Sequence, residues 1–177
     1  MQQVIIIDTS ILCVYLEVPG KEIVGKDDDK WDKQRVDQYL DERIKHKAQF
    51  IVPVAAIIET GNHIAQANHQ RFVTANRFAN LLIQMANREM PWEIFTEQEY
   101  QLIWSETQIK QLATEWPKLA EARLSLADFT IKEIANFYHN LNPKKFTVEI
   151  FTADQGLKSY EPTVISTPKY PQPRRRK

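Results

Sequence analysis

The stretch Val4-Ile5-Ile6-Ile7-Asp8-Thr9-Ser10 decides the fold of this chain. Four branched apolar residues without polar alternation are typical of a strand that is covered on both faces, as in a parallel sheet flanked by helices. In such sheets, ligands bind beyond the carboxyl ends of the strands. Because Asp8 follows the apolar run directly, we expect it at a functional edge. Taken alone, Asp8 or Ser10 also suits the N-cap of a following helix.

Strands and helices are predicted to alternate along the rest of the chain. Further strands are predicted at Gln49–Val52, Trp92–Phe95, Phe146–Thr152 and Thr163–Ser166. Helices are predicted at Ser10–Leu16, Asp32–Lys47, Val54–Asn68, Arg71–Asn87, Glu97–Ala113 and Ser125–Leu141. The apolar side of the fourth helix is expected to consist of Phe72, Phe78, Leu81, Leu82 and Met85. This alternation predicts an α/β fold with a central, mostly parallel β-sheet flanked by α-helices on both faces.

The composition indicates one soluble globular domain, with 43% hydrophobic and 26% charged residues in a chain of 177. We expect this domain to span residues 1–167 and a disordered basic tail to follow at 168–177. A single cysteine, Cys13, cannot form an internal disulfide, and no Cys/His cluster has zinc spacing. With no apolar run long enough to cross a membrane and no signal peptide, the expected location is the cytoplasm.

The formal charge of zero is unevenly distributed. The tail holds five basic residues and no acids, so residues 1–167 carry 18 basic against 23 acidic residues, a net charge of −5. This balance does not indicate a nucleic-acid-binding protein. A polyanionic substrate would have to be attracted by local basic groups and by metal ions. The tail itself is either an arm that contacts RNA or a segment that only aids solubility.

Four acids stand at informative positions in the expected fold: Asp8, Glu59, Asp128 and Asp154. Most of them follow or open elements at one edge of the sheet, so they are expected to lie together. Carboxylates brought close repel one another unless protons or cations offset their charge. Because His and Cys are scarce near these positions, Mg²⁺ or Mn²⁺ is a better candidate for this role than zinc.

Each acid also has a purely structural interpretation. Ser125 and Asp128 match a capping box, in which the acid stabilises the start of a helix. Asp154 precedes Gly156 by two residues and suits an Asx-turn. Glu59 can be a solvated helical acid. Only the combination of all four indicates a site.

The four motifs together resemble those of the PIN-domain nucleases, in particular the VapC-like toxins of bacterial toxin–antitoxin pairs. The resemblance rests on an apolar strand followed by Asp8-Thr9-Ser10, on Val-Pro-Val-Ala-Ala-Ile-Ile-Glu ending at Glu59, on Ser-Leu-Ala-Asp ending at Asp128, and on Thr152-Ala153-Asp154 followed by Leu157. The motifs occur in the order of the family and span residues 4–166. The resemblance therefore covers nearly the whole expected domain.

This resemblance implies a PIN-like fold and a metal-dependent endoribonuclease that hydrolyses RNA phosphodiester bonds. Asp8, Glu59, Asp128 and Asp154 would hold one or two Mg²⁺ or Mn²⁺ ions, which activate water and stabilise charge on the phosphate. Thr9, Ser10 and Thr152 would position carboxylates, waters or substrate. The resemblance also implies that the chain is the toxin of a pair, that a cognate antitoxin crosses the acidic groove, and that the chain forms a homodimer, for which Asp32–Lys47 and Arg71–Asn87 offer apolar surface.

Several features leave alternatives open. The chain is longer than the compact toxins through the loop around Asp27 to Trp31, whose run of three aspartates is either a metal site or a solvated turn. Leu157 and Lys158 stand where the family often has an aromatic residue. His63, one turn after Glu59, is a metal ligand or a polar contact.

Two other functions compete with the nuclease hypothesis. The first is a catalytically silent PIN-like module for RNA binding or assembly, which would have no need to keep a self-repelling acid cluster. The second is a phosphatase of the haloacid-dehalogenase kind, which also begins with an apolar strand and an aspartate. The chain resembles such a phosphatase poorly, because Ser10 stands where those enzymes have a second aspartate.

Overall fold

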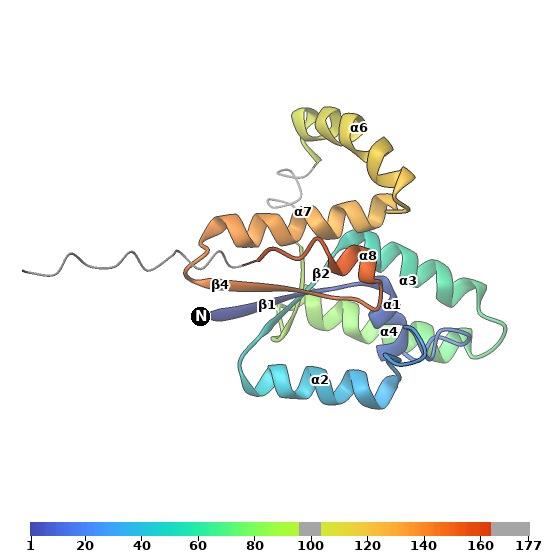
Figure 1. The fold of residues 1–177 in the computed structure, drawn as a ribbon. Helices are drawn as coiled ribbons and strands as arrows, with labels where there is room; N and C mark the ends of the chain where they lie inside the picture. The colour runs from blue at the N-terminus through green and yellow to red at the C-terminus, as the bar shows by residue number, and fades with distance from the viewer. Residues whose placement is uncertain (96–103, 164–177) are drawn as a thin grey trace, which may run out of the picture.

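The structure, a computed structural model, describes residues 1–95 and 104–163. Within these residues, four parallel strands form one sheet in the order β3-β2-β1-β4. The strands are β1 (Gln2–Ile7), β2 (Gln49–Val52), β3 (Trp92–Ile94) and β4 (Phe146–Phe151). β1 lies between β2 and β4, and Figure 1 shows β1 and β4 side by side. The predicted α/β class with a parallel central sheet is confirmed.

The predicted burial of the opening strand on both faces is confirmed as well. Ile5 and Ile7 belong to one apolar core, whereas Val4 and Ile6 belong to a second core on the opposite face. All four side chains are buried, as the alternation of side chains along a strand between two covered faces requires. The Val/Ile run is therefore continuous because both of its faces need apolar residues.

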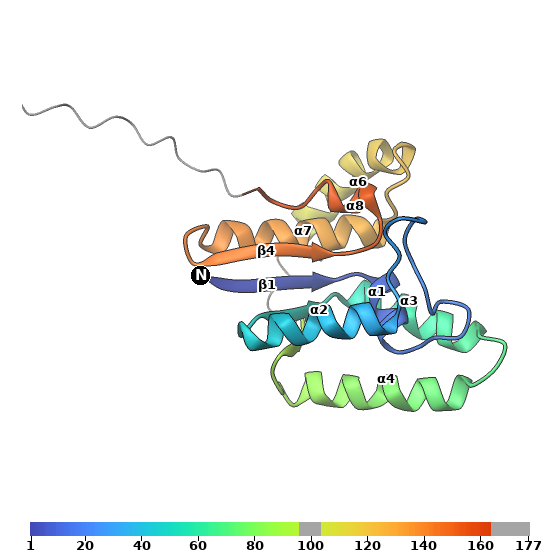
Figure 2. The same cartoon turned by 60° about the horizontal axis from the view of Figure 1, so that its bottom comes forward.

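Helices cover both faces of the sheet. The first core contains residues of α1 (Thr9–Tyr15), α2 (Lys33–Lys45), α3 (Val54–Gln66) and α4 (Arg71–Ala86). The second core contains residues of α7 (Leu126–Leu141) and α8 (Gln155–Lys158). Figures 1 and 2 show α7 on one side of the sheet and α2 and α4 on the other, with α6 (Glu106–Glu121) beyond α7.

Two sequence-based expectations about helices differ from the structure. α6 continues past the expected end at Ala113 to Glu121, with Pro117 inside it. Ala113 is exposed, so water can replace the helical hydrogen bond that its carbonyl loses to the proline. In α4, Phe72 does not join the core but is 80% exposed. Phe72 stands six residues before Phe78. In a helix of 3.6 residues per turn this spacing places the two side chains about 120° apart, so Phe72 lies away from the buried side.

Three expectations fall wholly or partly outside the described residues. These are the start of the helix expected at Glu97–Ala113, most of the strand expected at Thr163–Ser166, and the basic tail 168–177. For the described part of the chain, no helix has the length and apolar character needed to cross a membrane.

The loop from Glu17 to Trp31, called the 17–31 loop below, is held against the carboxyl edge of the sheet. Val24 and Trp31 exchange two backbone hydrogen bonds of 3.0 and 2.8 Å. The Trp31 ring packs edge-on against Phe151 at the end of β4, with 4.9 Å between ring centroids. Gly25 has φ +96°, and a Cβ there would lie 2.2 Å from the carbonyl oxygen of Asp29, so only glycine fits.

Two of the three consecutive aspartates of this loop are engaged in ion pairs. Asp29 accepts from Arg35 at 2.7 Å, and Asp27 pairs with Lys30 at 3.0 Å. Arg35 also lies over the Trp31 ring, 3.8 Å from its centroid. These contacts favour the solvated-turn interpretation of the aspartate run over a metal site.

The outer edge of β4 is closed by the side chains of Lys158, the last residue of α8, and of Glu161, which follows that helix. The backbone N–H of Ile150 donates to Glu161 Oε2 at 2.7 Å, and the carbonyl of Ile150 accepts from Lys158 Nζ at 2.9 Å. Lys158 and Glu161 are themselves paired at 2.6 Å. Lys158 stands where the family that the motifs resemble often has an aromatic residue. In this chain its side chain hydrogen-bonds to the edge of the sheet.

Candidate functional site

One cavity of about 360 Å³ contains all four acids that the sequence singles out. Asp8 follows β1, Glu59 lies in the second turn of α3, Asp128 lies in the first turn of α7, and Asp154 follows β4. We call this space the acid cavity. It is lined by Asp8, Thr9, Ser10, Cys13, Lys21, Val24, Gly25, Glu59, His63, Asp128, Ala153 and Asp154.

The parallel register of β1 and β4 explains why two of these motifs meet. Ile7 and Phe151 are partners in the sheet, so Asp8 and Thr152 leave the two strands side by side. The backbone N–H of Asp8 still donates to the carbonyl of Phe151 at 3.1 Å. Thr152 Oγ1 then donates to Asp8 Oδ2 at 2.8 Å. Segments 144 residues apart in the chain are thereby joined at one carboxylate.

Asp8 is the most buried of the acids, with 7% of its surface exposed. It occupies the N-cap position of α1, but its side chain makes no capping hydrogen bond. Its Oδ2 instead accepts from Ser10 Oγ at 2.6 Å and from Thr152. Burial raises the pKa of Asp8 and the charge of Asp128 raises it further, while the two hydroxyl donors act in the opposite direction. The protein thus holds a carboxylate where its charge is unfavourable.

The carboxylates of the other three acids each accept a hydrogen bond from a hydroxyl or a backbone N–H. Glu59 Oε2 accepts from Thr9 Oγ1 at 2.7 Å. Asp128 Oδ2 accepts from the backbone N–H of Ser125 at 2.8 Å, and Ser125 Oγ accepts from the N–H of Asp128 at 3.1 Å, a complete capping box. Asp154 Oδ1 accepts from the N–H of Gly156 at 2.7 Å. The structural interpretations of Asp128 and Asp154 are therefore correct, and the same contacts hold both carboxylates in the cavity wall.

The hydroxyls Thr9, Ser10 and Thr152 each donate to one of these carboxylates. Thr152 Oγ1 also accepts from the backbone N–H of Asp154 at 3.0 Å, so a single side chain links Asp8 to Asp154. Hydroxyls of this kind hold an acceptor in place and lower the cost of keeping it charged.

Several lining residues were not predicted from the sequence. Lys21, Val24 and Gly25 come from the 17–31 loop, which no local pattern places against the acids. Cys13 lines the same cavity, and burial raises the pKa of its thiol to about 11, a shift that Lys21 partly opposes. The thiol is therefore protonated at neutral pH and is no candidate nucleophile. His63 also reaches the cavity, as its spacing from Glu59 allows.

The donor set suits a hard cation in its chemistry. Carboxylate and hydroxyl oxygens are the ligands that Mg²⁺ and Mn²⁺ prefer. The raised pKa of buried Asp8 also marks a charge that a cation would compensate. In residues 1–95 and 104–163, however, no three Asp, Glu, His or Cys side chains lie close enough together to hold one ion. The acids share a cavity without forming a closed set of ligands.

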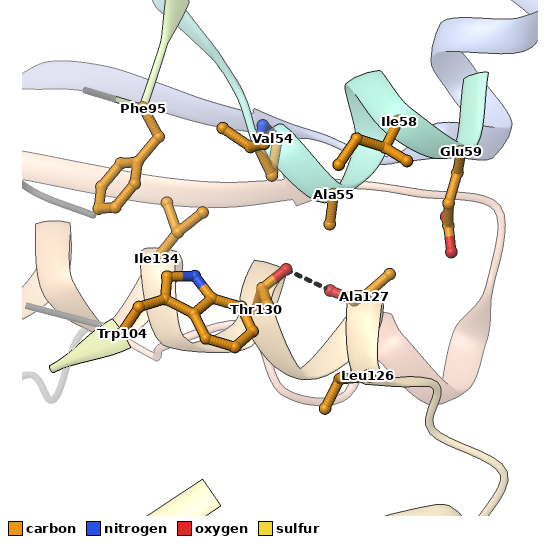
Figure 3. A pocket seen from close by; sticks show the side chains of 11 residues that line it. Val54, Ala55, Ile58, Glu59, Phe95, Trp104, Leu126, Ala127, Thr130 and Ile134 are labelled. Atoms are coloured by element: carbon orange, nitrogen blue, oxygen red, sulfur yellow. Dashed lines mark hydrogen bonds between the residues drawn. The ribbon is translucent and has the colours of Figure 1, made fainter. Parts of the chain in front are cut away.

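A second cavity of about 300 Å³ adjoins the first at Glu59 (Figure 3). Figure 3 shows Val54, Ala55 and Ile58 of α3 facing Leu126 and Ala127 of α7 across it, with Glu59 at one end. We call it the apolar cavity. Its lining consists of Pro53, Val54, Ala55, Ile58, Glu59, Phe95, Trp104, Leu126, Ala127, Thr130 and Ile134. The Thr130 hydroxyl donates its proton to the carbonyl of Ala127 at 2.7 Å, so this proton is not available to a ligand in the cavity.

Comparison of the chain with protein-family models, with curated proteins and with solved structures gives no match. Function is therefore inferred from the geometry of the site and from the motifs of the sequence.

Proposed function

We propose that this chain is a metal-dependent endoribonuclease with a PIN-like fold. The observation that carries the proposal is the acid cavity itself, which brings Asp8, Glu59, Asp128 and Asp154 together from four separate segments. It lies beyond the carboxyl ends of β1 and β4, where parallel α/β sheets bind ligands. The four-stranded parallel sheet of the described residues, with helices on both faces, is compatible with the PIN-like fold.

In this proposal the four acids hold one or two Mg²⁺ or Mn²⁺ ions. A divalent cation bound there supplies the activation of water and the neutralisation of charge on the phosphodiester. The protein supplies the arrangement: Thr9 orients Glu59, while Ser10 and Thr152 orient Asp8 through hydrogen bonds of 2.6 to 2.8 Å. The burial of Asp8 raises its pKa, so its charged form is less favourable than that of a solvated carboxylate, and a bound cation would offset this cost.

A second candidate function is a catalytically silent PIN-like module that binds RNA or assembles with a partner. The observation that favours it is the absence, within the described part of the chain, of three metal-binding side chains close enough for one ion. The buried charge of Asp8 opposes it, because a module without metal has no use for a carboxylate that burial destabilises.

The wider biological setting is also a proposal. Following the resemblance to VapC-like toxins, we propose that the chain acts in the cytoplasm as the toxin of a pair and that a cognate antitoxin covers the acid cavity. We further propose a homodimer. Its support is the exposed apolar surface of α4, where Phe72, Val73 and Ile83 are accessible.

Cleavage of labelled single-stranded RNA in Mn²⁺ or Mg²⁺ tests the proposed activity. Wild-type protein is expected to cleave internally and to stop when the metal is chelated. Asp8→Asn is expected to abolish cleavage, because it removes the charge of the acid joined to Ser10 and Thr152. Asp28→Asn is the matched control, since Asp28 lies in the 17–31 loop outside the cavity lining. Failure of the wild type to cleave would favour the silent module, whereas unchanged cleavage by Asp8→Asn would contradict the assignment of catalysis to the acid cavity.

A further inference from the structure

We infer that Lys21 forms a binding site for a phosphate group of the RNA backbone on the wall of the acid cavity. The inference rests on the proposed function and names a residue of the 17–31 loop that the sequence motifs do not include. It gives this loop a part in substrate recognition.

The charge balance of the cavity is the first argument. Its lining contains four carboxylates, and among the described lining residues Lys21 is the only lysine or arginine. A cavity of four carboxylates repels a polyanion, and bound cations offset this repulsion only in part. An ammonium group on the same wall provides an attractive contact for a phosphate next to the acids.

The availability of Lys21 is the second argument. Five other lysines are engaged in ion pairs with acids: Lys30, Lys33, Lys110, Lys132 and Lys158. Within residues 1–95 and 104–163, Lys21 has no ion pair and no side-chain hydrogen bond. Its side chain is exposed and remains available for a ligand although carboxylates line the same cavity.

The fixed position of Lys21 is the third argument. Its backbone N–H donates to the carbonyl of Val18 at 2.9 Å, and the N–H of buried Val18 donates to the carbonyl of Cys13 in α1 at 2.9 Å. Further along, Val24 is bonded to Trp31, whose ring packs on Phe151. The loop is thus attached on one side to the helix that follows Asp8 and on the other to the strand that precedes Thr152. An anchored backbone reduces the entropy lost when the side chain engages a ligand.

Binding of random-sequence single-stranded RNA tests the inference in the Asp8→Asn background, where cleavage does not interfere. Adding Lys21→Met is expected to weaken binding about tenfold, the size of one charge-assisted hydrogen bond. It is also expected to reduce the slope of log affinity against log salt by about 0.7, the value for one phosphate contact on a single strand. Lys21→Arg is expected to keep most of the affinity and the slope.

Lys26→Met is the matched control, because Lys26 lies in the same loop but not in the cavity lining, and the substitution removes the same charge. Equal effects of Lys21→Met and Lys26→Met would overturn the inference, because Lys21 would then contribute only the general electrostatic attraction between a positive charge and RNA. A lower melting temperature or weaker Mn²⁺ binding in Lys21→Met would also overturn it, since Lys21 would then support the site structurally. Failure of the inference leaves metal-dependent cleavage by the wild type intact, whereas failure of the proposed function removes that cleavage.

Discussion

The acid cavity and the apolar cavity share Glu59 and draw on the same two helices, α3 and α7, yet their walls are held in opposite ways. In the acid cavity each carboxylate is fixed by a hydrogen bond from a hydroxyl or a backbone N–H. In the apolar cavity, Phe95 and Ile134 are fixed by packing in the second core. Two adjoining spaces of similar size thus depend on different forces.

The difference indicates that the apolar cavity wall stabilises the folded protein, whereas the acid cavity wall destabilises it. Burial of Ile134 contributes hydrophobic free energy, whereas burial of Asp8 raises its pKa and opposes its charged form. A region that works against folding persists only if surrounding contacts and a ligand offset its cost. We therefore expect substitutions in the acid cavity to change activity and substitutions in the apolar cavity to change stability.

Glu59 lines both cavities, so its substitution is the most direct test of this division. Glu59→Gln keeps the size of the side chain but removes the charge that accepts from Thr9. RNA cleavage in Mn²⁺ is expected to fall about a hundredfold, with little change in melting temperature. Thr9→Val serves as the comparison, because it removes the hydrogen bond to Glu59 but keeps the carboxylate, and it should cost less activity. Wild-type rates in Glu59→Gln would assign the residue to the apolar wall alone.

Ile134→Ala should separate stability from activity. Ile134 is buried in the second core and lines the apolar cavity, so its truncation is expected to cost about 2–5 kcal/mol of unfolding free energy. Urea unfolding measures this loss, and cleavage per folded molecule should stay at the wild-type level. Leu141→Ala, at an exposed position of the same helix, should change stability by about 0.5 kcal/mol or less. A lower rate in folded Ile134→Ala would show that the two cavities are coupled.

The pH dependence of stability should report the free energy that the buried charge of Asp8 costs the folded protein. Since its pKa is raised in the folded protein, protonated Asp8 stabilises the fold in acid, and this contribution is lost as pH rises through the folded-state pKa. The Asp8→Asn variant carries no charge at this position, so its stability does not fall for this reason as pH rises. Without divalent cations, the melting temperature of Asp8→Asn should therefore exceed that of the wild type increasingly as pH rises to neutrality.

Addition of Mn²⁺ provides the control for this measurement. At neutral pH it should raise the melting temperature of the wild type more than that of Asp8→Asn, because a cation offsets the buried charge. Parallel pH curves for the two proteins, with or without Mn²⁺, would contradict the assignment of the cost to Asp8.

Ser125→Ala should have the smallest effect. Ser125 Oγ accepts from the N–H of Asp128, and its loss is expected to cost about 1 kcal/mol of stability. Because the same capping box holds Asp128 in the acid cavity, cleavage should also fall a few fold. Ser105→Ala removes a similar cap from α6 and should lower stability without affecting the rate. Equal rates for both variants would mean that the cap of α7 does not position Asp128.

Much of the fold could be predicted from local patterns. The run Val4–Ile7 has apolar residues at every position because both faces are covered, and the ends of β2 at Gln49 and Val52 coincide with those expected. The meeting of Asp8 with Asp154 followed from the rule that parallel strands end at one edge. Phe72 was wrongly assigned to the apolar side of α4, although it is exposed. The error arose because apolar residues on a helix do not all face the core.

The parts of the site that could not be predicted depend on contacts distant in sequence. Lys21 lines the acid cavity in a loop that is held by the packing of Trp31 against Phe151, a residue 120 positions further along, and no periodicity in the loop indicates this contact. The apolar cavity likewise requires α3, α7 and Trp104 to leave a space between them. Capping and chemistry were treated as alternatives for Asp128, whereas the structure shows one side chain that caps a helix and lines the acid cavity.

The pair Lys158 and Glu161 has a consequence for how this protein associates with itself. By bonding both backbone groups of Ile150, these side chains imitate a residue of a neighbouring strand. An incoming chain would have to displace an ion pair before it could extend the sheet at β4, which protects this edge from aggregation. The proposed homodimer is therefore expected to use helical surfaces such as that of α4, where a closed dimer can form instead of an open-ended fibre.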